Sequence, residues 1–286
     1  MDPKKWLLTD RVAIVTGAGN GIGNAIALGF AAHGARLAII DIDKEALDKA
    51  AADIRATGAK VIALHGDVRK QENVDRLVGD CVKQWGGVHV LVNNVGWTMQ
   101  KLFMDMTEQE WMEMLDVNLV QAFRWTRAAV KVMIEKKIKG SIINISTIEG
   151  VRAAPGFTPY SAAKAGLINF TRSMALELAP HWIRMNTILP DHTLSPRLIK
   201  KRVDLQTPTR PNQIPLPRRG RPEDHAGAAI FLASDMSAWV TGILLPVDGG
   251  SLAASGWKLT PSGHWSTDAV HGYVHSGFPF DYGFTP

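Results

Sequence analysis

Tyr160 and Lys164 are the residues whose types and spacing most directly suggest chemistry. They lie four positions apart in Tyr-Ser-Ala-Ala-Lys, within a predicted helix over 158–179, and side chains four apart share one helix face. A free phenol has a pKa of about 10, so it exchanges protons at neutral pH only if its anion is stabilised, as a neighbouring ammonium together with a second cation in the site would do. The pair is therefore a candidate acid/base centre, although the same spacing also occurs on ordinary helix faces.

A second candidate is a glycine-rich segment that could hold a phosphate. It reads Thr16-Gly17-Ala18-Gly19-Asn20-Gly21-Ile22-Gly23, and it lies between a predicted strand over 11–16 and a predicted helix over 21–32. Glycines permit positive φ and close backbone approach to a pyrophosphate, while the N–H groups at the helix start point at the anion. A tight turn without a ligand is the alternative, but the strand–turn–helix context favours a dinucleotide.

Asp41 ends the second predicted strand, Arg-Leu-Ala-Ile-Ile-Asp over 36–41. An acidic side chain at this place hydrogen-bonds the adenosine ribose hydroxyls of a dinucleotide, and it would repel a 2′-phosphate. Asn20 occupies a position where a cation would assist a 2′-phosphate. Both residues favour NAD over NADP, with the alternative that Asp41 only caps the helix predicted from Asp43.

Strands and helices alternate along the chain and must position these residues. Short runs rich in Val and Ile precede longer amphipathic segments, and strands that are apolar on both faces indicate a parallel sheet covered on both sides. The expected fold is α/β, a single doubly wound sheet of about seven strands. The predicted strands are 11–16, 36–41, 60–65, 88–94, 141–146, 183–189 and 242–250, and the predicted helices are 21–32, 43–56, 70–85, 107–136, 158–179 and 222–234.

Two segments interrupt this alternation. Residues 191–221 are rich in Pro and Arg and too long for a plain connection, so we expect a substrate lid there. Residues 252–286 hold seven of the 21 aromatic residues, which argues against disorder. The predicted organisation is a dinucleotide-binding domain over 1–251 that includes the lid, followed by an aromatic C-terminal extension over 252–286.

The net charge of +5 is concentrated in the lid, where eight Lys or Arg and two Asp give +6. No aromatic residue lies among these cations, so we exclude a nucleic-acid partner. A solvated loop is the default interpretation, and attraction of an anionic substrate is the sharper hypothesis. No apolar run is long enough for a signal peptide or a membrane span, so we expect a cytoplasmic protein without a membrane partner. His271 and His275 lack accompanying Cys or acidic ligands, so no metal is expected.

The ordered motifs resemble the short-chain dehydrogenase/reductase family over about residues 9–251. They are the glycine turn, Asp67-Val68, Asn93-Asn94-Val95-Gly96, Asn118, a hydroxyl at a strand end, and Tyr160 with Lys164. The resemblance implies a Rossmann-type fold, a nicotinamide dinucleotide cofactor, which Asp41 and Asn20 indicate to be NAD, and a homotetramer. It also implies a hydride transfer in which Tyr160 is the general acid/base, Lys164 binds the nicotinamide ribose, and Asn118 holds a water that links Lys164 to solvent.

The resemblance assigns further residues to the cofactor. They are Gly17, Asn20, Gly21, Ile22 and Gly23 at the pyrophosphate, Asp41 and Ile42 at the adenosine ribose, Asp67 and Val68 at the adenine, and Asn94, Gly96, Pro190 and Thr193 along the cleft, with the Thr193 backbone meeting the nicotinamide carboxamide.

Two departures from the family pattern bear on function. The residue 13 positions before Tyr160 is Thr147, where the family usually has Ser. Gly150 and Tyr160 both fit the family spacing without a gap, so the neighbouring Ser146 does not take that position. Thr donates the same hydrogen bond, but its methyl group would narrow the pocket. Asp191 replaces the Gly of a Pro-Gly turn after the sixth strand, which changes the local backbone path.

The resulting hypothesis is an NAD-dependent oxidoreductase that acts on a small alcohol or carbonyl substrate. One alternative is an NADP-dependent 3-oxoacyl-type reductase, which Asp41 disfavours. The other is a catalytically weak dinucleotide-binding sensor, which Thr147 and Asp191 leave open.

Overall fold

The computed structural model describes residues 7–194, 214–259 and 265–266. Seven parallel strands form one sheet in the order β3-β2-β1-β4-β5-β6-β7. The order reverses direction beside β1, which creates the crevice where α/β sheets of this type bind ligands. The strands are β1 Val12–Thr16, β2 Arg36–Asp41, β3 Val61–His65, β4 Val90–Asn93, β5 Ser141–Ile145, β6 Arg184–Pro190 and β7 Leu244–Val247.

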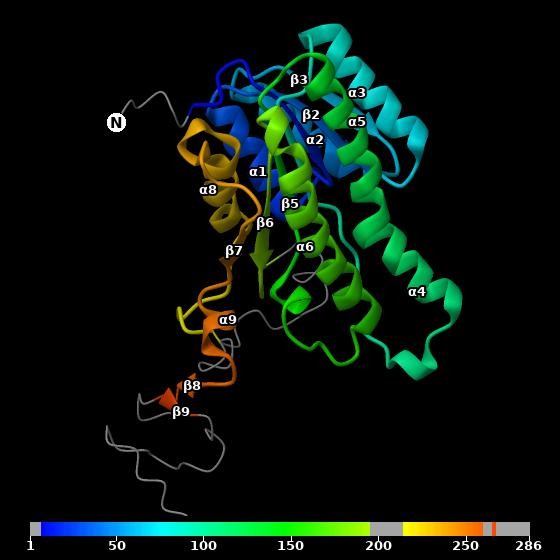
Figure 1. Ribbon diagram of the computed structural model, residues 1–286, viewed down its shortest axis with the longest axis vertical. Coiled ribbons are helices and arrows are strands. Elements are labelled where there is room, and N and C mark those ends of the chain that lie inside the picture. The colour runs from blue at the N-terminus through cyan, green and yellow to red at the C-terminus, as the bar shows by residue number, and fades with distance from the viewer. Residues whose placement is uncertain (1–6, 195–213, 260–264, 267–286) are drawn as a thin grey trace, which may run out of the picture.

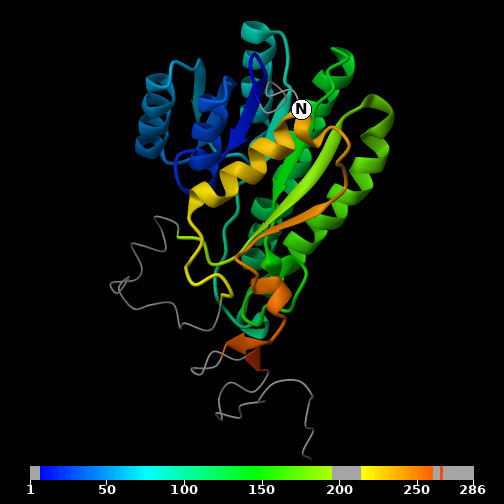
Figure 2. The ribbon, with the colours of Figure 1, turned by 90° about the vertical axis from the view of Figure 1, so that its left-hand side faces the viewer.

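Helices cover both faces of the sheet. One face is covered by α1, α2 and α8, and the other by α3, α5 and α6, as Figures 1 and 2 show from two sides. The helices are α1 Gly21–Ala32, α2 Lys44–Ala56, α3 Gln71–Trp85, α4 Glu108–Leu115, α5 Gln121–Glu135, α6 Thr158–Leu178, α8 Pro222–Ala233 and α9 Ser251–Ala254. Fold class, strand number and the doubly wound arrangement are confirmed.

The core consists of two apolar layers because successive side chains of a strand point to opposite faces. In β1, Ala13 and Val15 pack with the α1, α2 and α8 side, whereas Val12 and Ile14 pack with the α3, α5 and α6 side. All four side chains are fully buried. This explains why the strands are continuous apolar runs rather than alternating ones.

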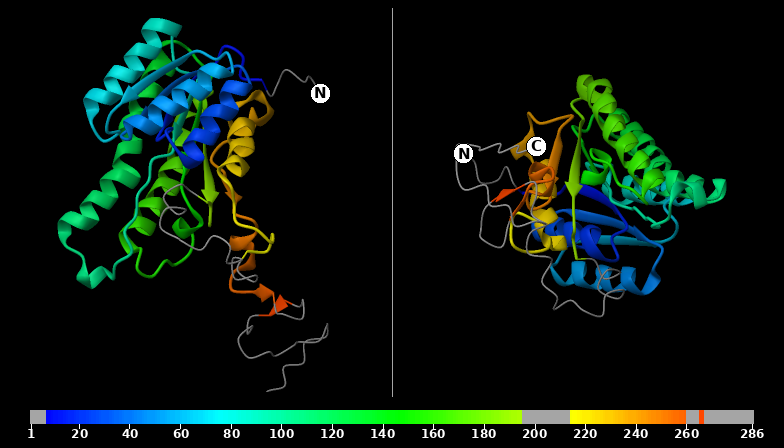
Figure 3. Two further views of the ribbon diagram at one scale, coloured as in Figure 1. Left: turned by 180° about the vertical axis from the view of Figure 1, so that it is seen from behind. Right: turned by 90° about the horizontal axis from the view of Figure 1, so that it is seen from below.

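The helix predicted over 107–136 is present as a continuous run over α4, a π-helical turn and α5, so it is not α-helical throughout. It begins with a capping box at Thr107 and Glu110, and the five residues Asp116–Val120 between α4 and α5 form a π-helical turn. π-Turns inside helices are rare and often mark functional sites. Here the turn contains Asn118, while α4 reaches past the carboxyl ends of the strands (Figures 1 and 3).

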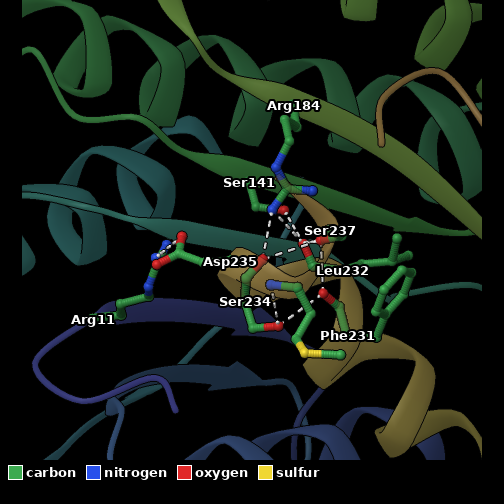
Figure 4. A network of polar contacts seen from close by, with 9 residues as sticks. Arg11, Ser141, Arg184, Phe231, Leu232, Ser234, Asp235 and Ser237 are labelled. Atoms are coloured by element: carbon green, nitrogen blue, oxygen red, sulfur yellow. Dashed lines mark hydrogen bonds and ion pairs between the residues drawn. The ribbon is translucent and has the colours of Figure 1, made fainter. Parts of the chain in front are cut away.

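A polar network at the amino ends of β5 and β6 anchors the C-terminus of α8 (Figure 4). The Arg184 guanidinium donates to the carbonyl oxygens of Leu232 at 2.7 Å, Ser234 at 3.3 Å and Val240 at 3.3 Å. The Ser141 hydroxyl also donates to Leu232, at 2.7 Å. Burial lowers the pKa of Arg184 to about 10, so the side chain remains a cation at neutral pH and satisfies carbonyls that the helix end leaves unpaired.

Replacing Arg184 with Met is expected to lower the free energy of unfolding by about 2 kcal/mol, because these buried carbonyls lose a charged donor. For a chain of this size the midpoint of thermal unfolding should fall by roughly 4–8 °C, measured by calorimetry. Arg76→Met, on the exposed face of α3, is the control and should change stability by less than about 0.5 kcal/mol. Equal midpoints for the two variants would contradict this role of Arg184.

The two irregular segments are described only in part. Residues 195–213 of the predicted lid, and most of the aromatic extension including His271 and His275, lie outside the described residues. The described parts of the extension are α9 and a two-stranded antiparallel pair, β8 Lys258–Leu259 with β9 Trp265–Ser266.

Candidate active site

The glycine turn lies at the carboxyl end of β1 and is shaped to admit a phosphate. Gly17 and Gly21 have φ of +64° and +58°, a conformation that favours glycine. A Cβ on Gly23 would lie 2.2 Å from the Gly17 carbonyl oxygen, so only glycine fits there. Ile22 is half-buried in the first turn of α1, and exposed Asn20 is the N-cap residue. The N–H groups at this helix start point to the crevice of the sheet.

Asn94 holds the glycine turn in place from β4. Its Nδ2 donates to the carbonyl oxygens of Thr16 at 3.0 Å and Gly17 at 3.1 Å. The Thr16 hydroxyl in turn donates to Val92 and accepts from the Asn94 N–H. Asn94 therefore orders the turn from the neighbouring strand, and its backbone position leaves Gly96 free to face the cleft.

Asp41 ties the end of β2 to the glycine turn. One carboxylate oxygen accepts from the Gly19 N–H at 2.8 Å and the other from the Asp43 N–H at 3.0 Å. Asp43, not Asp41, is the N-cap residue of α2, since its side chain accepts from the Ala46 N–H. The capping alternative for Asp41 is therefore wrong, and the carboxylate lies beside the pyrophosphate turn, next to Ile42, whose side chain is 66% exposed.

The predicted adenine contacts, Asp67 and Val68, follow β3. Asp67 makes a bidentate ion pair with Arg69, at 2.7 Å for the closest atoms, and hydrogen bonding from Arg69 lowers the pKa of the Asp67 carboxyl. Val68 is buried, and its carbonyl oxygen accepts from the Trp125 indole at 2.9 Å. Arg69 was not anticipated, because a cation two residues after an Asp does not reveal whether the two side chains pair.

Lys164 is a buried cation with hydrogen-bonding capacity to spare. Its side chain is 2% exposed, and its one hydrogen bond to a described residue goes to the Ile145 carbonyl oxygen at 2.9 Å. An ammonium has three donors, so two remain for a ligand such as a ribose diol. A Cβ added at Gly96 would lie 3.1 Å from both Lys164 Nζ and Asn118 Oδ1, which shows how closely these three residues converge.

Asn118 is fixed by the π-helical turn. Its Nδ2 donates to the carbonyl oxygens of Trp97 at 2.7 Å and Met114 at 2.9 Å, and its Oδ1 accepts from the Trp97 N–H at 3.1 Å. The side chain thereby joins α4 to the loop that follows Gly96. Both amide N–H donors are engaged, whereas Oδ1 can accept a second hydrogen bond, so the water expected at Asn118 stays a prediction.

Tyr160 lies on the same face of α6 as Lys164, whose Nζ is 5.9 Å from the centre of the phenol ring. Burial raises the pKa of Tyr160 to about 12, a hydrogen bond with Thr147 acts in the opposite direction, and the negative charge of Glu149 adds to the rise. Burial also lowers the pKa of Lys164 to about 8. Lys164 by itself therefore does not lower the phenol pKa, and the second cation expected from the sequence is needed to favour the phenolate.

Thr147 and Ser146 point in different directions from the end of β5. The Ser146 hydroxyl donates to the Lys164 carbonyl oxygen at 3.0 Å, inside α6, whereas the Thr147 hydroxyl is the one that acts to lower the pKa of Tyr160. Thr147 also donates to the Pro190 carbonyl oxygen at 3.3 Å. The geometry agrees with the predicted frame, in which Thr147 shares the reacting site with Tyr160.

The turn after β6 closes the site. Thr193 is half-buried, and its hydroxyl donates to the Asp191 carbonyl oxygen at 2.7 Å. Thr193 also forms a single parallel bridge with Gly220. The turn around Asp191 is thus well defined despite the replacement of glycine, and Asp191 itself has a negative φ. An adjoining cavity of about 490 Å³ is lined by residues from 191–192, 214–224 and 246–250.

The comparisons with known proteins agree on one family. A family model described as enoyl-(acyl carrier protein) reductase matches residues 17–251. The chain is 41% identical to the 3-oxoacyl-[acyl-carrier-protein] reductase FabG of Chlamydia muridarum over 245 residues, 85% of this chain and 98% of that protein. The chain belongs to the short-chain dehydrogenase/reductase family.

Solved structures of this family share the fold. A short-chain type dehydrogenase/reductase from Mycobacterium marinum is 31% identical, with a TM-score of 0.81 over 87% of this chain and 98% of that one. Levodione reductase is 30% identical, with a TM-score of 0.79 over 86% and 99%. The protein is accordingly an oxidoreductase of a family that binds a nicotinamide dinucleotide.

The residues present fit such a cofactor. The glycine turn packs so closely at Gly17 and Gly23 that it keeps a backbone suited to a pyrophosphate, and Lys164, with donors to spare, lies close to Gly96. Within the described residues, no group of three or more His, Cys, Asp or Glu could hold a metal ion. In the same parts of the chain no helix is both long and apolar enough to cross a membrane.

Within this short-chain dehydrogenase/reductase site, Thr147→Ala is expected to lower kcat by about 10²-fold, as for loss of one donor to a reacting oxygen. Ser146→Ala should leave kcat within about threefold and lower stability by about 1 kcal/mol, because it loses only a buried hydrogen bond. Thr147→Ser is the control and should retain activity. Steady-state kinetics test this prediction. A large loss of kcat in Ser146→Ala alone would show that Ser146, and not Thr147, supplies the hydroxyl to the reaction.

Proposed function

We propose that the protein interconverts a carbonyl group and a secondary alcohol with NAD(H), and that a 3-oxoacyl thioester is its leading substrate class. The observation that carries the reaction type is the convergence of Tyr160, Thr147 and Lys164 at the carboxyl ends of β5 and β6. The thioester is supported by the name of the Chlamydia relative at 41% identity. This revises the order of the sequence hypotheses, which put a general alcohol or ketone first.

When bound, the dinucleotide supplies or accepts a hydride at its nicotinamide ring. For reduction, Thr147 donates a hydrogen bond to the substrate oxygen, and Tyr160 gives that oxygen its proton. Lys164 holds the ribose through its spare donors and places a positive charge near the phenol. For oxidation the same residues act in reverse, with Tyr160 as the base.

The cofactor proposal is NAD(H), and it rests on Asp41. The carboxylate is held by the Gly19 and Asp43 N–H groups beside the pyrophosphate turn, so its position is fixed and a 2′-phosphate near it would be repelled. Asn20 adds no positive charge at the turn. The proposal therefore combines the substrate class of the Chlamydia reductase with a choice of cofactor read from this chain.

A smaller ketone without a thioester is the second candidate. It is supported by the likeness to levodione reductase, which has a similar TM-score to that of the Mycobacterium enzyme. The methyl group of Thr147 beside Tyr160 also favours a compact substrate. An anionic substrate, a homotetrameric assembly and a cytoplasmic location stay predictions. Arg218, one of the lid cations among the described residues, forms an ion pair with Asp224 at 2.6 Å and so has part of its charge already balanced.

The test is an absorbance assay at the nicotinamide band, with NADH and NADPH used separately. The substrates are a 3-oxoacyl thioester, a cyclic diketone and the corresponding secondary alcohols. We expect turnover of the thioester, with kcat/KM at least about tenfold higher for NADH than for NADPH, which corresponds to about 1.4 kcal/mol. Turnover of the diketone alone would favour the second candidate. Binding of NADH without turnover of any substrate would indicate the sensor.

A further inference from the structure

His225 is a fully buried histidine in the second turn of α8 that the proposed reaction does not use. Its Nε2 lies 2.8 Å from the Thr193 hydroxyl, across the junction between α8 and the turn after β6. Among the charged groups nearby, Asp224 precedes it on the same helix and is paired with Arg218. The buried imidazole of His225 therefore forms its hydrogen bond with Thr193 in the turn after β6.

The direction of this hydrogen bond follows from the network. The Thr193 hydroxyl carries one proton, which it donates to the Asp191 carbonyl oxygen, so it accepts from His225. Nε2 must then carry a proton. Burial lowers the pKa of His225 to about 4, so the ring is neutral at pH 7, and Nδ1 is a bare acceptor. That atom has no hydrogen-bond partner among the described residues.

In the described parts of the chain, the hydrogen bond between His225 and Thr193 is the one side-chain hydrogen bond that joins α8 to the turn after β6, which is otherwise held by local and backbone contacts. Thr193 contacts Gly220 through one backbone bridge, and the Leu194 N–H donates to the Gly220 carbonyl oxygen at 2.9 Å. On its other side α8 packs closely against α1, since a Cβ added at Gly29 would lie 3.3 Å from Ile230. His225 thus connects the turn after β6 with the helix pair that carries the glycine cradle.

We propose that His225 is a positioning residue that fixes the turn 191–193 for the nicotinamide end of the cofactor. The inference rests on the proposed function and on the contact that the family resemblance implies between the carboxamide and the Thr193 backbone. Without the hydrogen bond from His225, the turn would sample other conformations, and only the nicotinamide half of the dinucleotide would lose its contact. The adenosine half, held by Asp41 and the glycine cradle, would be unaffected.

The experiment compares binding of NADH with binding of ADP-ribose, which lacks the nicotinamide, by calorimetric titration. We expect His225→Leu to weaken NADH binding by roughly five- to tenfold, the effect of one buried hydrogen bond, and to leave ADP-ribose binding unchanged. His225→Gln retains an N–H donor and should restore most of the NADH affinity. Ser141→Ala removes a hydrogen bond at the other end of α8 and should change neither affinity.

Equal weakening of NADH and ADP-ribose in His225→Leu would overturn the proposal, because it would show a general structural role. An unchanged affinity for NADH would also overturn it. If His225→Leu does not fold, His225→Asn keeps a polar side chain too short to reach the Thr193 hydroxyl and must show the NADH-selective loss. If the wild-type protein instead bound NADH no more tightly than ADP-ribose, the nicotinamide would add no affinity, and the proposed function itself would be refuted.

Discussion

Tyr160→Phe should lower kcat by at least about 10³-fold, within the range that general acid/base groups contribute to enzymatic rates. The variant keeps the ring, its packing on α6 and its distance from Lys164, and it loses only the phenol hydroxyl. NADH binding should stay within a few-fold, because the glycine cradle and Asp41 do not contact this hydroxyl. Steady-state kinetics and a separate NADH titration measure the two effects.

Two results would remove Tyr160 from this role. Retained turnover would mean that another group transfers the proton. A parallel loss of NADH binding would mean that the hydroxyl supports the cofactor and not the reaction. Thr147→Ser is a useful companion, because it alters the partner of the phenol but keeps a hydroxyl there.

Asp41→Asn should raise kcat/KM for NADPH by about 10²-fold, because like charges placed together in a binding site cost several kcal/mol. In Asn one of the two carboxylate oxygens becomes an NH₂ group, so only one of the Gly19 and Asp43 N–H groups keeps its acceptor while the negative charge disappears. NADH should bind somewhat more weakly, because a ribose hydroxyl loses a charged acceptor. The ratio of kcat/KM for the two cofactors is the measured quantity.

Asp43→Asn is the matched control. It removes a carboxylate two residues away, and Asn remains a good N-cap for α2. The ratio of kcat/KM for NADH to kcat/KM for NADPH should be the same in this variant as in the unmodified protein. A similar shift in both variants would show that general electrostatics, and not the position of Asp41, sets the cofactor preference.

The sequence was most informative where one pattern has one structural outcome. Apolar runs predicted the strands to within one or two residues at most ends, because a strand buried on both faces must be continuously apolar. The helix predicted over 21–32 matches α1, because glycines and an N-cap residue define its start. Tyr160 and Lys164 share a face, as their spacing requires.

The sequence was least informative about a local change in helix type and about side-chain contacts that depend on tertiary structure. The π-helical turn at Asp116–Val120 leaves no periodic signal, because one extra residue per turn is hidden in a long amphipathic segment. Arg69 gains its role from its ion pair with Asp67. His225 gains its role from Thr193, which lies 32 residues earlier in the chain and is brought beside it by the packing of α8. Such contacts depend on tertiary structure, which short-range patterns do not encode.

The most direct test of the account is the transfer of deuterium from NADH deuterated at both C4 positions to a 3-oxoacyl thioester. The product alcohol is analysed by mass spectrometry, with the Tyr160→Phe variant run in parallel. The account predicts that the alcohol gains one mass unit from the cofactor and that the variant forms little of it. Product without deuterium, or equal product from the variant, would contradict the assignment of Tyr160 and its neighbours to a hydride-transfer site.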